Sequence, residues 1–167
     1  MQIKTNPTRM ALLKLRKRLV MARRGHKLLK DKLEGLIQIF MPMVEEYGNL
    51  RTRVDAELPA TLRLFILASA TSGEKAVTAA LDEFEARIDI DIMMKNIMSI
   101  LIPELTLKGF DIRSSYSTVS TNTDFDEASE SLRGVFPVLL KLAALEDSVL
   151  RMAGEIEKTR RRVNALE

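Results

Sequence analysis

The sequence contains no cysteine, no tryptophan and a single histidine, His26. Without cysteine, disulfides, thiolate metal sites and cysteine nucleophiles are excluded, and the composition agrees with a reducing cytoplasm. No run of 18 apolar residues occurs, and the basic N-terminus is not followed by a continuous apolar region. The sequence therefore predicts neither a membrane-spanning helix nor a secretory signal.

Signatures of catalysis are missing as well. No GxxxxGK[ST] motif is present, and Gly73-Glu74-Lys75 lacks both the upstream glycine and the following hydroxyl residue of a P-loop. Zinc would have no ligand set, and His26 falls on a helical core position, where a polar contact is the better interpretation. We expect no catalytic residue, no cofactor and no metal site.

Aromatic residues are few, six Phe and two Tyr, whereas nine methionines and many leucines are available for helix packing. The first third of the chain places core-type residues at alternating spacings of three and four, which is the period of a left-handed coiled coil. At about 1.5 Å per residue, a helix from Pro7 to Leu58 would be a rod of roughly 78 Å. The core-type positions are Leu12, Leu15, Leu19, Ala22, His26, Leu29, Leu33, Leu36, Phe40, Met43, Tyr47, Leu50 and Val54.

The boundaries of this first helix, 7–58, are predicted from its capping and breaking residues. Thr5 or Asn6 would cap it, and Pro7 would occupy the first turn, where its missing N–H costs nothing. Pro42 interrupts the pattern without shifting it, which predicts a bend in a continuing helix. Pro59 is the predicted interruption.

Residues 60–124 are predicted to form a central lobe of short helices, a β-hairpin and a Ser/Thr-rich loop over 111–124. A turn is expected at Thr71-Ser72-Gly73. Isoleucines then alternate with aspartates from residue 88 to 92, which predicts a hairpin over about 86–107 with Lys95-Asn96 between its strands.

A second helix with heptad spacing is predicted over residues 125–167, capped by Asp124 or Asp126. The predicted fold is therefore mainly α: a long antiparallel two-helix coiled coil with a small β-hairpin/helical insert. If Val54 lies near Leu132, Glu167 lies beside Leu19, and the N-terminal end overhangs without a partner.

That overhanging end is strongly basic. Residues 1–32 hold eleven Lys or Arg against one acid, Asp31, although the whole chain has a net charge of only +3. Such a block favours nucleic acid, acidic lipid or an acidic protein collar as its partner. Solvated outer positions of a coiled coil are the alternative explanation, although eleven basic residues against one acid are more than solubility requires.

Three segments resemble the D subunit of V-type and archaeal A-type ATPases. They are Asn6–Met10 (NPTRM), Arg24–Lys32 (RGHKLLKDK) and Glu155–Glu167 (EIEKTRRRVNALE), and Lys95–Ser99 followed by Pro103 is similar to the hairpin of that family. The resemblance covers nearly the whole chain in order. Members of the family usually continue for some dozens of residues past a point like Leu166, so the chain is expected to be C-terminally truncated.

The resemblance implies a noncatalytic central-stalk subunit, the rotor shaft of a rotary ATPase or ATP synthase. It implies partners in the hexamer of A and B subunits, in the small F subunit and in the funnel-shaped subunit on the membrane ring, with no nucleic acid and no direct membrane insertion. The expected location is the cytoplasmic face of the membrane, where torque would couple ATP hydrolysis or synthesis to proton or sodium transport.

Two partner-binding surfaces are expected from this resemblance and from the charge pattern. The surface for the catalytic hexamer would comprise Arg9, Lys14, Arg16, Lys17, Arg23, Arg24, Arg160, Arg161 and Arg162. The surface for the stalk partner would comprise Ile88, Ile90, Ile92, Ile97 and Met98.

Composition and spacing alone leave two other functions open. A basic coiled coil could bind nucleic acid with an affinity that falls steeply with salt, although the basic region has no aromatic residue for base stacking and no recognition motif. A generic adaptor that binds partner helices is the other alternative.

Overall fold

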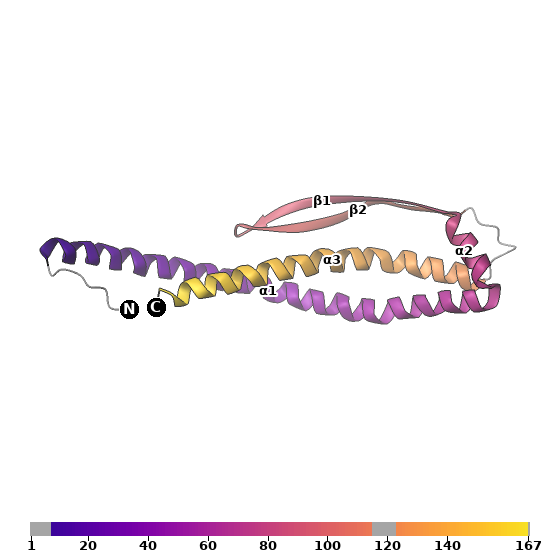
Figure 1. Ribbon diagram of the computed structural model, residues 1–167, viewed down its shortest axis with the longest axis horizontal. Helices are drawn as coiled ribbons and strands as arrows, with labels where there is room; N and C mark the ends of the chain where they lie inside the picture. The colour runs from indigo at the N-terminus through magenta and orange to yellow at the C-terminus, as the bar shows by residue number, and fades with distance from the viewer. Residues whose placement is uncertain (1–7, 115–122, 167) are drawn as a thin grey trace. The chain divides into compact units, whose positions relative to one another are not determined.

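The computed structural model describes residues 8–114 and 123–166. It contains three helices and one two-stranded antiparallel sheet (Figure 1), so the chain is mainly α as predicted. The elements in chain order are α1 (Arg9–Ser72), α2 (Glu74–Asp82), β1 (Phe84–Ile97), β2 (Ile100–Ser114) and α3 (Thr123–Asn164).

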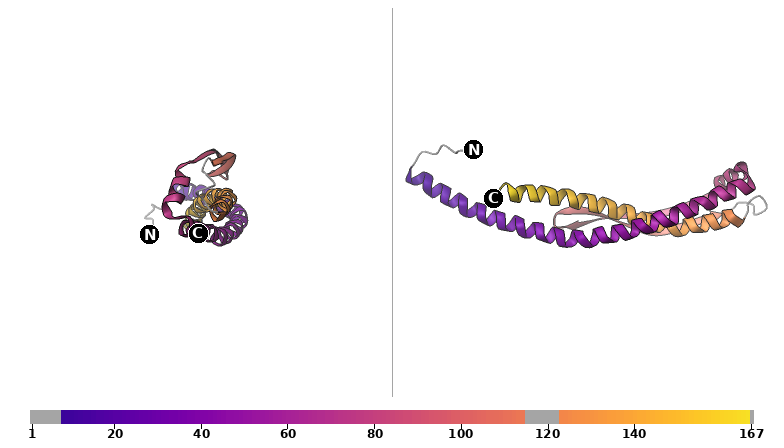
Figure 2. Two further views of the ribbon diagram at one scale, coloured as in Figure 1. Left: turned by 90° about the vertical axis from the view of Figure 1, so that its right-hand side faces the viewer. Right: turned by 90° about the horizontal axis from the view of Figure 1, so that it is seen from below.

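Two compact units divide the chain. The first unit combines Met1–Pro42 with Leu150–Glu167, and the second unit is Met43–Val149. Both α1 and α3 pass from one unit into the other, while α2 and the hairpin belong to the second unit alone (Figure 2).

The start of α1 is set by a side-chain cap. The N–H of Ala11 donates a hydrogen bond to Thr8 Oγ1 at 3.2 Å, so Thr8 satisfies one of the free donors of the first turn. The described part of the helix therefore begins at Arg9, directly after Thr8. The predicted caps Thr5 and Asn6, like Pro7, lie outside the described residues.

The predicted end of this helix at Leu58 is wrong, because α1 continues through both Pro42 and Pro59 to Ser72. A proline inside a helix removes one N–H donor and costs about 3 kcal/mol or more. Residues on both sides of Pro59, Val54 and Thr61, are buried in the second unit. Packing of this face outweighs the lost hydrogen bond, which explains why Pro59 does not interrupt the helix.

Gly73 forms the turn that was expected near Thr71-Ser72-Gly73. Its φ of 86° lies in the left-handed region, which only glycine adopts without strain, and its N–H donates to the Ser69 carbonyl at 3.0 Å. The glycine thereby ends α1 and allows α2 to begin at Glu74, next to it.

The end of α1, α2 and the start of α3 share a closed core in the second unit. Phe125 of α3 is fully buried together with Ala68, Val77 and Ala80. The ring of Phe65 meets the ring of Phe125 edge to face, with centroids 5.8 Å apart and planes at 84°. Burial of one aromatic ring by three helices holds these elements together.

Contacts join α1 and α3 in both units, and in the second unit the pairs Thr61–Ser131 and Phe65–Phe125 show that the two helices run antiparallel. In the second unit, Thr61 Oγ1 lies 2.7 Å from Ser131 Oγ and donates to the Glu57 carbonyl at 3.0 Å, so the Ser131 hydroxyl is the donor to Thr61. In the first unit, Lys32 Nζ lies 3.7 Å from Glu155 Oε1.

The axial register agrees with the prediction in the first unit only. Pairing Val54 with Leu132 would place Lys32 beside Gly154, next to its observed partner Glu155. The same pairing would place Thr61 beside Phe125, whereas Thr61 lies against Ser131. Heptad periodicity determines which face is apolar, but specific contacts determine how far one helix is shifted along the other.

The hairpin begins before and ends after the predicted range of about 86–107, because its strands are Phe84–Ile97 and Ile100–Ser114. Phe84 pairs with Ser114 at its base, so the expected loop over 111–124 begins with strand residues, and its remainder from 115 to 122 lies outside the described residues. The turn is at Met98-Ser99 and not at Lys95-Asn96, because the strands pair as far as Ile97 and Ile100.

Asp124 and Asp126 lie in the first turn of α3, which begins at Thr123, and not at its cap. Arg161 and Arg162 lie in the last turn, and the helix ends at Asn164. Acidic residues at the first turn and basic residues at the last turn both stabilise the helix macrodipole.

Candidate partner-binding surfaces

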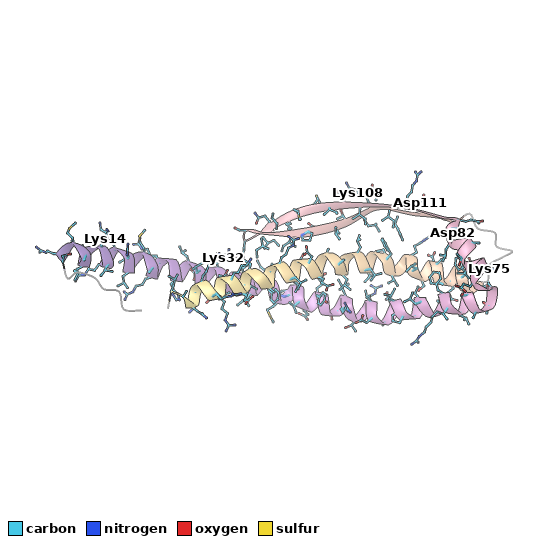
Figure 3. All side chains as sticks on the ribbon, in the orientation of Figure 1. Lys14, Lys32, Lys75, Asp82, Lys108 and Asp111 are labelled. Carbon is cyan, nitrogen blue, oxygen red and sulfur yellow. The ribbon has the colours of Figure 1, made fainter. Side chains whose placement is uncertain are left out.

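The basic segment is the part of α1 from Arg9 to Arg24. All six side chains predicted there for hexamer binding are exposed, and none forms an ion pair with a residue that the structure describes. Figure 3 shows Lys14 on this segment. The six residues are Arg9, Lys14, Arg16, Lys17, Arg23 and Arg24.

Apolar side chains of the basic segment are exposed as well. Leu12 is 50% exposed and Leu15 and Leu19 are similarly accessible, although all three occupy heptad core positions. Since Lys32 lies opposite Glu155 and α3 ends at Asn164, the antiparallel pairing provides no described helix opposite the first turns of α1. These exposed apolar side chains alternate with the basic side chains of the same segment.

Charge at the start of α1 opposes the helix macrodipole. Its first turn contains no acidic residue, whereas α2 begins with Glu74 and α3 with Asp124 and Asp126. Positive charge near a helix N-terminus is destabilising by several tenths of a kcal/mol. The basic residues at this end are therefore not explained by helix stability.

The arginines at the end of α3 belong to the same unit as the basic segment. Arg160, Arg161 and Arg162 are all exposed, and the Arg161 guanidinium donates to Glu157 at 2.6 Å. The first unit therefore holds all nine basic residues of the predicted hexamer surface.

The predicted stalk-partner surface on the hairpin is only partly accessible. Ile88, Ile92 and Met98 are exposed, whereas Ile90 and Ile97 are half-buried.

A groove of about 430 Å³ separates the distal half of the hairpin from the helices of the second unit, and sequence reasoning missed it. Its apolar lining comes from Met43, Leu50 and Leu145 on the helices and from Ile102, Pro103 and Leu105 on β2. Four charged residues also line it, and none of them pairs with another described side chain. They are Glu46, Lys95, Glu104 and Lys141.

The base of the hairpin is fixed to α3 by aromatic stacking. The rings of Phe110 and Phe136 lie parallel, with centroids 4.9 Å apart and planes at 10°. No periodicity in the sequence relates a strand residue to a particular helix position, so neither this contact nor the groove could be read from the pattern.

Over residues 8–114 and 123–166, no three carboxylate or histidine side chains are grouped as metal ligands, and no helix is long and apolar enough to cross a membrane. The hydrogen bond that Arg51 donates to Asp55 raises the pKa of the Arg51 guanidinium, which is charged in any case.

Comparison with known proteins identifies the family. The family model for the D subunit of ATP synthase matches residues 11–167. The chain belongs to the ATP synthase D-subunit family.

Curated relatives agree with this assignment to the D-subunit family. The V-type ATP synthase D subunit of Fusobacterium nucleatum is 44% identical over 169 residues, which cover 99% of this chain and 80% of the relative. The V-type ATP synthase D subunits of Thermoanaerobacter pseudethanolicus and Clostridium botulinum are each 42% identical, over 99% and 100% of this chain and 80% of each relative. The resemblance noted in the sequence is thereby confirmed.

Proposed function

We propose that this member of the D-subunit family is the noncatalytic central-stalk component of a V/A-type rotary ATPase or ATP synthase. In this role it transmits torque between the catalytic A/B hexamer and the membrane ring, and so couples ATP hydrolysis or synthesis to proton or sodium transport. It acts on the cytoplasmic face of the membrane as a peripheral component, together with the F subunit and the funnel-shaped subunit on the ring.

The observation that carries this proposal is the basic segment of α1, in a chain whose family is that of an ATP synthase component. The basic residues of this segment are exposed and form no ion pair with a residue that the structure describes, so the segment fits an acidic protein bore. The long helices suit mechanical transmission, and the nucleotide sites would belong to the neighbouring subunits.

The proposed role of the basic segment is tested by charge reversal in the reconstituted complex. Arg16→Glu/Lys17→Glu should lower the yield of assembled complex, or the number of ions transported per ATP hydrolysed. The matched control is Arg63→Glu/Lys75→Glu, which reverses two exposed charges of the second unit. Equal yield and equal coupling for both double variants would contradict the proposed contact.

Nucleic-acid binding by the same segment is distinguished by a tagged pull-down at moderate salt, with and without nuclease. Recovery of ATPase subunits that survives nuclease treatment supports the stalk function. Partners that depend on nucleic acid would instead assign the basic segment to that ligand, and capture would fall steeply with salt.

A further inference from the structure

The two strands of the hairpin differ in how much they are covered. On β2, Ile100 and Ile102 are only 7% and 6% exposed, and Phe110 stacks on Phe136 of α3. None of the side chains described on β1 is buried, and Ile92 is 63% exposed. In the view of Figure 1, β2 is drawn between β1 and α3, which agrees with this difference. The hairpin therefore packs against the helices through β2, and β1 is its more exposed strand.

The backbone groups on the outer edge of β1 can be assigned from the turn. Met98 and Ser99 have φ values of 51° and 73°, the signs of a type I′ turn, and they connect the paired residues Ile97 and Ile100. The two residues that flank a two-residue turn form two backbone hydrogen bonds with each other. Because hydrogen-bonded and non-hydrogen-bonded pairs alternate along antiparallel strands, only every second residue of β1 bonds to β2. The N–H and C=O groups of Ile90, Ile92 and Met94 therefore point away from β2.

Pro103 independently supports this alternation. It pairs with Met94, and a proline, which has no N–H, is tolerated in a strand where no ladder bond is required. The backbone of Met94 accordingly makes no bond to β2.

The two outer edges of the hairpin are unequally protected against further pairing. On β2, Pro103 removes a donor, and Lys108 is the extra residue of a bulge, because Asp89 pairs with Gly109 and Ile90 with Leu107. Prolines and bulges are the usual devices that block an edge. Strand β1 has fourteen residues, no proline and no extra residue at that bulge.

The side chains of β1 define the chemistry that would fit beside it. Ile88, Ile92 and Met94 are exposed apolar side chains at alternate positions along one face. Asp89 and Lys95 are exposed charges on the other face, and neither forms an ion pair with a described residue. A complementary segment carries apolar residues on one face, with a basic residue beside Asp89 and an acidic residue beside Lys95.

We propose that the outer edge of β1 binds an extended segment of another subunit of the complex, which adds a third strand to the hairpin. The inference rests on the proposed function, because a subunit already held elsewhere in the complex supplies its strand at high local concentration. A second copy of this chain could place its Lys95 beside Asp89 when paired about Ile92, but it is not held near the edge as a subunit of the same complex is. An untethered copy is therefore disfavoured.

Amide-resolved hydrogen exchange of the chain, alone and in the assembled complex, tests this proposal. In the isolated chain, the amides of Ile90, Ile92 and Met94 should exchange rapidly, and those of Met93 and Lys95 slowly. In the complex the three outward amides should slow by at least about tenfold, because exchange then requires opening of the added strand. A partner that docks only through side chains would leave them fast.

Each alternative result has a defined meaning. Assembly with the outward amides still fast would overturn strand addition and leave the proposed function standing. Protection that appears in the isolated chain as its concentration rises would assign the edge to a second copy and overturn the proposed occupant. Failure to assemble with any ATPase subunit would overturn the proposed function and this inference with it.

A substitution provides the second test. Met94→Pro removes an outward N–H without removing a bond to β2, so the hairpin should persist, as judged by slow exchange of the Lys95 amide in the isolated chain. Binding to the rest of the complex should weaken by about tenfold, because the ring blocks the incoming strand. Met94→Leu keeps the N–H and is the matched control. Equal affinity of the two variants would overturn the proposal.

Discussion

The two ends of α1 have the same apolar spacing and different surroundings. Near its start, Leu12 and Leu15 occupy heptad core positions and are about half exposed, whereas Val54 and Ala68 near its end are buried. In the second unit, α2 and α3 cover the helix, and in the first unit α3 ends at Asn164. A heptad pattern thus specifies the face that can be buried, and the helices packed against it determine which part of it is buried.

The largest expected difference between these regions is in the cost of removing a core side chain. Phe125→Ala should lower the free energy of unfolding by about 3–5 kcal/mol, because it leaves a cavity among Phe65, Ala68 and Val77. Leu12→Ala, the matched truncation at an exposed position, should change it by less than about 0.5 kcal/mol. Urea unfolding followed by far-UV circular dichroism measures both, and equal effects would contradict the comparison.

A smaller effect is expected at the buried hydroxyl pair. Thr61→Val should cost about 1–3 kcal/mol, because Ser131 then loses its acceptor in a largely buried site. The double variant Thr61→Val/Ser131→Ala should recover part of this loss, since neither hydroxyl is then left without its partner. Unfolding of the four proteins gives the coupling energy, and strict additivity would show that the pair does not hold the helices in register.

At the basic end, a change of charge should act in opposite directions on the isolated chain and on the complex. Arg9→Glu removes a positive charge from the first turn of α1, which should stabilise that turn by about 0.3–1 kcal/mol. Hydrogen exchange in the first turns should slow accordingly. Under the proposed function the same variant should assemble less well. Slower exchange together with improved assembly would contradict the prediction, because helix stability and partner binding would then respond to this charge in the same direction.

The smallest effect is expected at the ion pair of the first unit. Lys32 and Glu155 lie 3.7 Å apart with side chains 31% and 24% exposed, so their coupling should be about 0.2–1 kcal/mol. A double-mutant cycle with Lys32→Ala and Glu155→Ala should give this value at low salt and less at high salt. A coupling that is insensitive to salt would indicate a more enclosed pair.

Sequence reasoning succeeded where one element's own pattern carries the information. The spacing of three and four predicted the mainly α fold, and the isoleucine alternation from Ile88 to Ile92 predicted a hairpin. Two predictions made from local signals were wrong. Pro59 does not end the helix, because packing of Val54 and Thr61 preserves it. The turn is not at Lys95-Asn96, because the strands pair beyond these residues. Contacts between elements, such as Phe110 on Phe136 and the groove beneath β2, had no signal in any single segment.

The type I′ turn of the hairpin has a consequence for how this ribbon opens. Both turn residues, Met98 and Ser99, have positive φ, and a non-glycine residue in that region costs about 1–2 kcal/mol. The opposite end is secured by the stacked rings of Phe110 and Phe136. Since Ile100 and Ile102 beside the turn are also buried, their packing offsets this cost, and neither end of the ribbon is the favoured place for it to open.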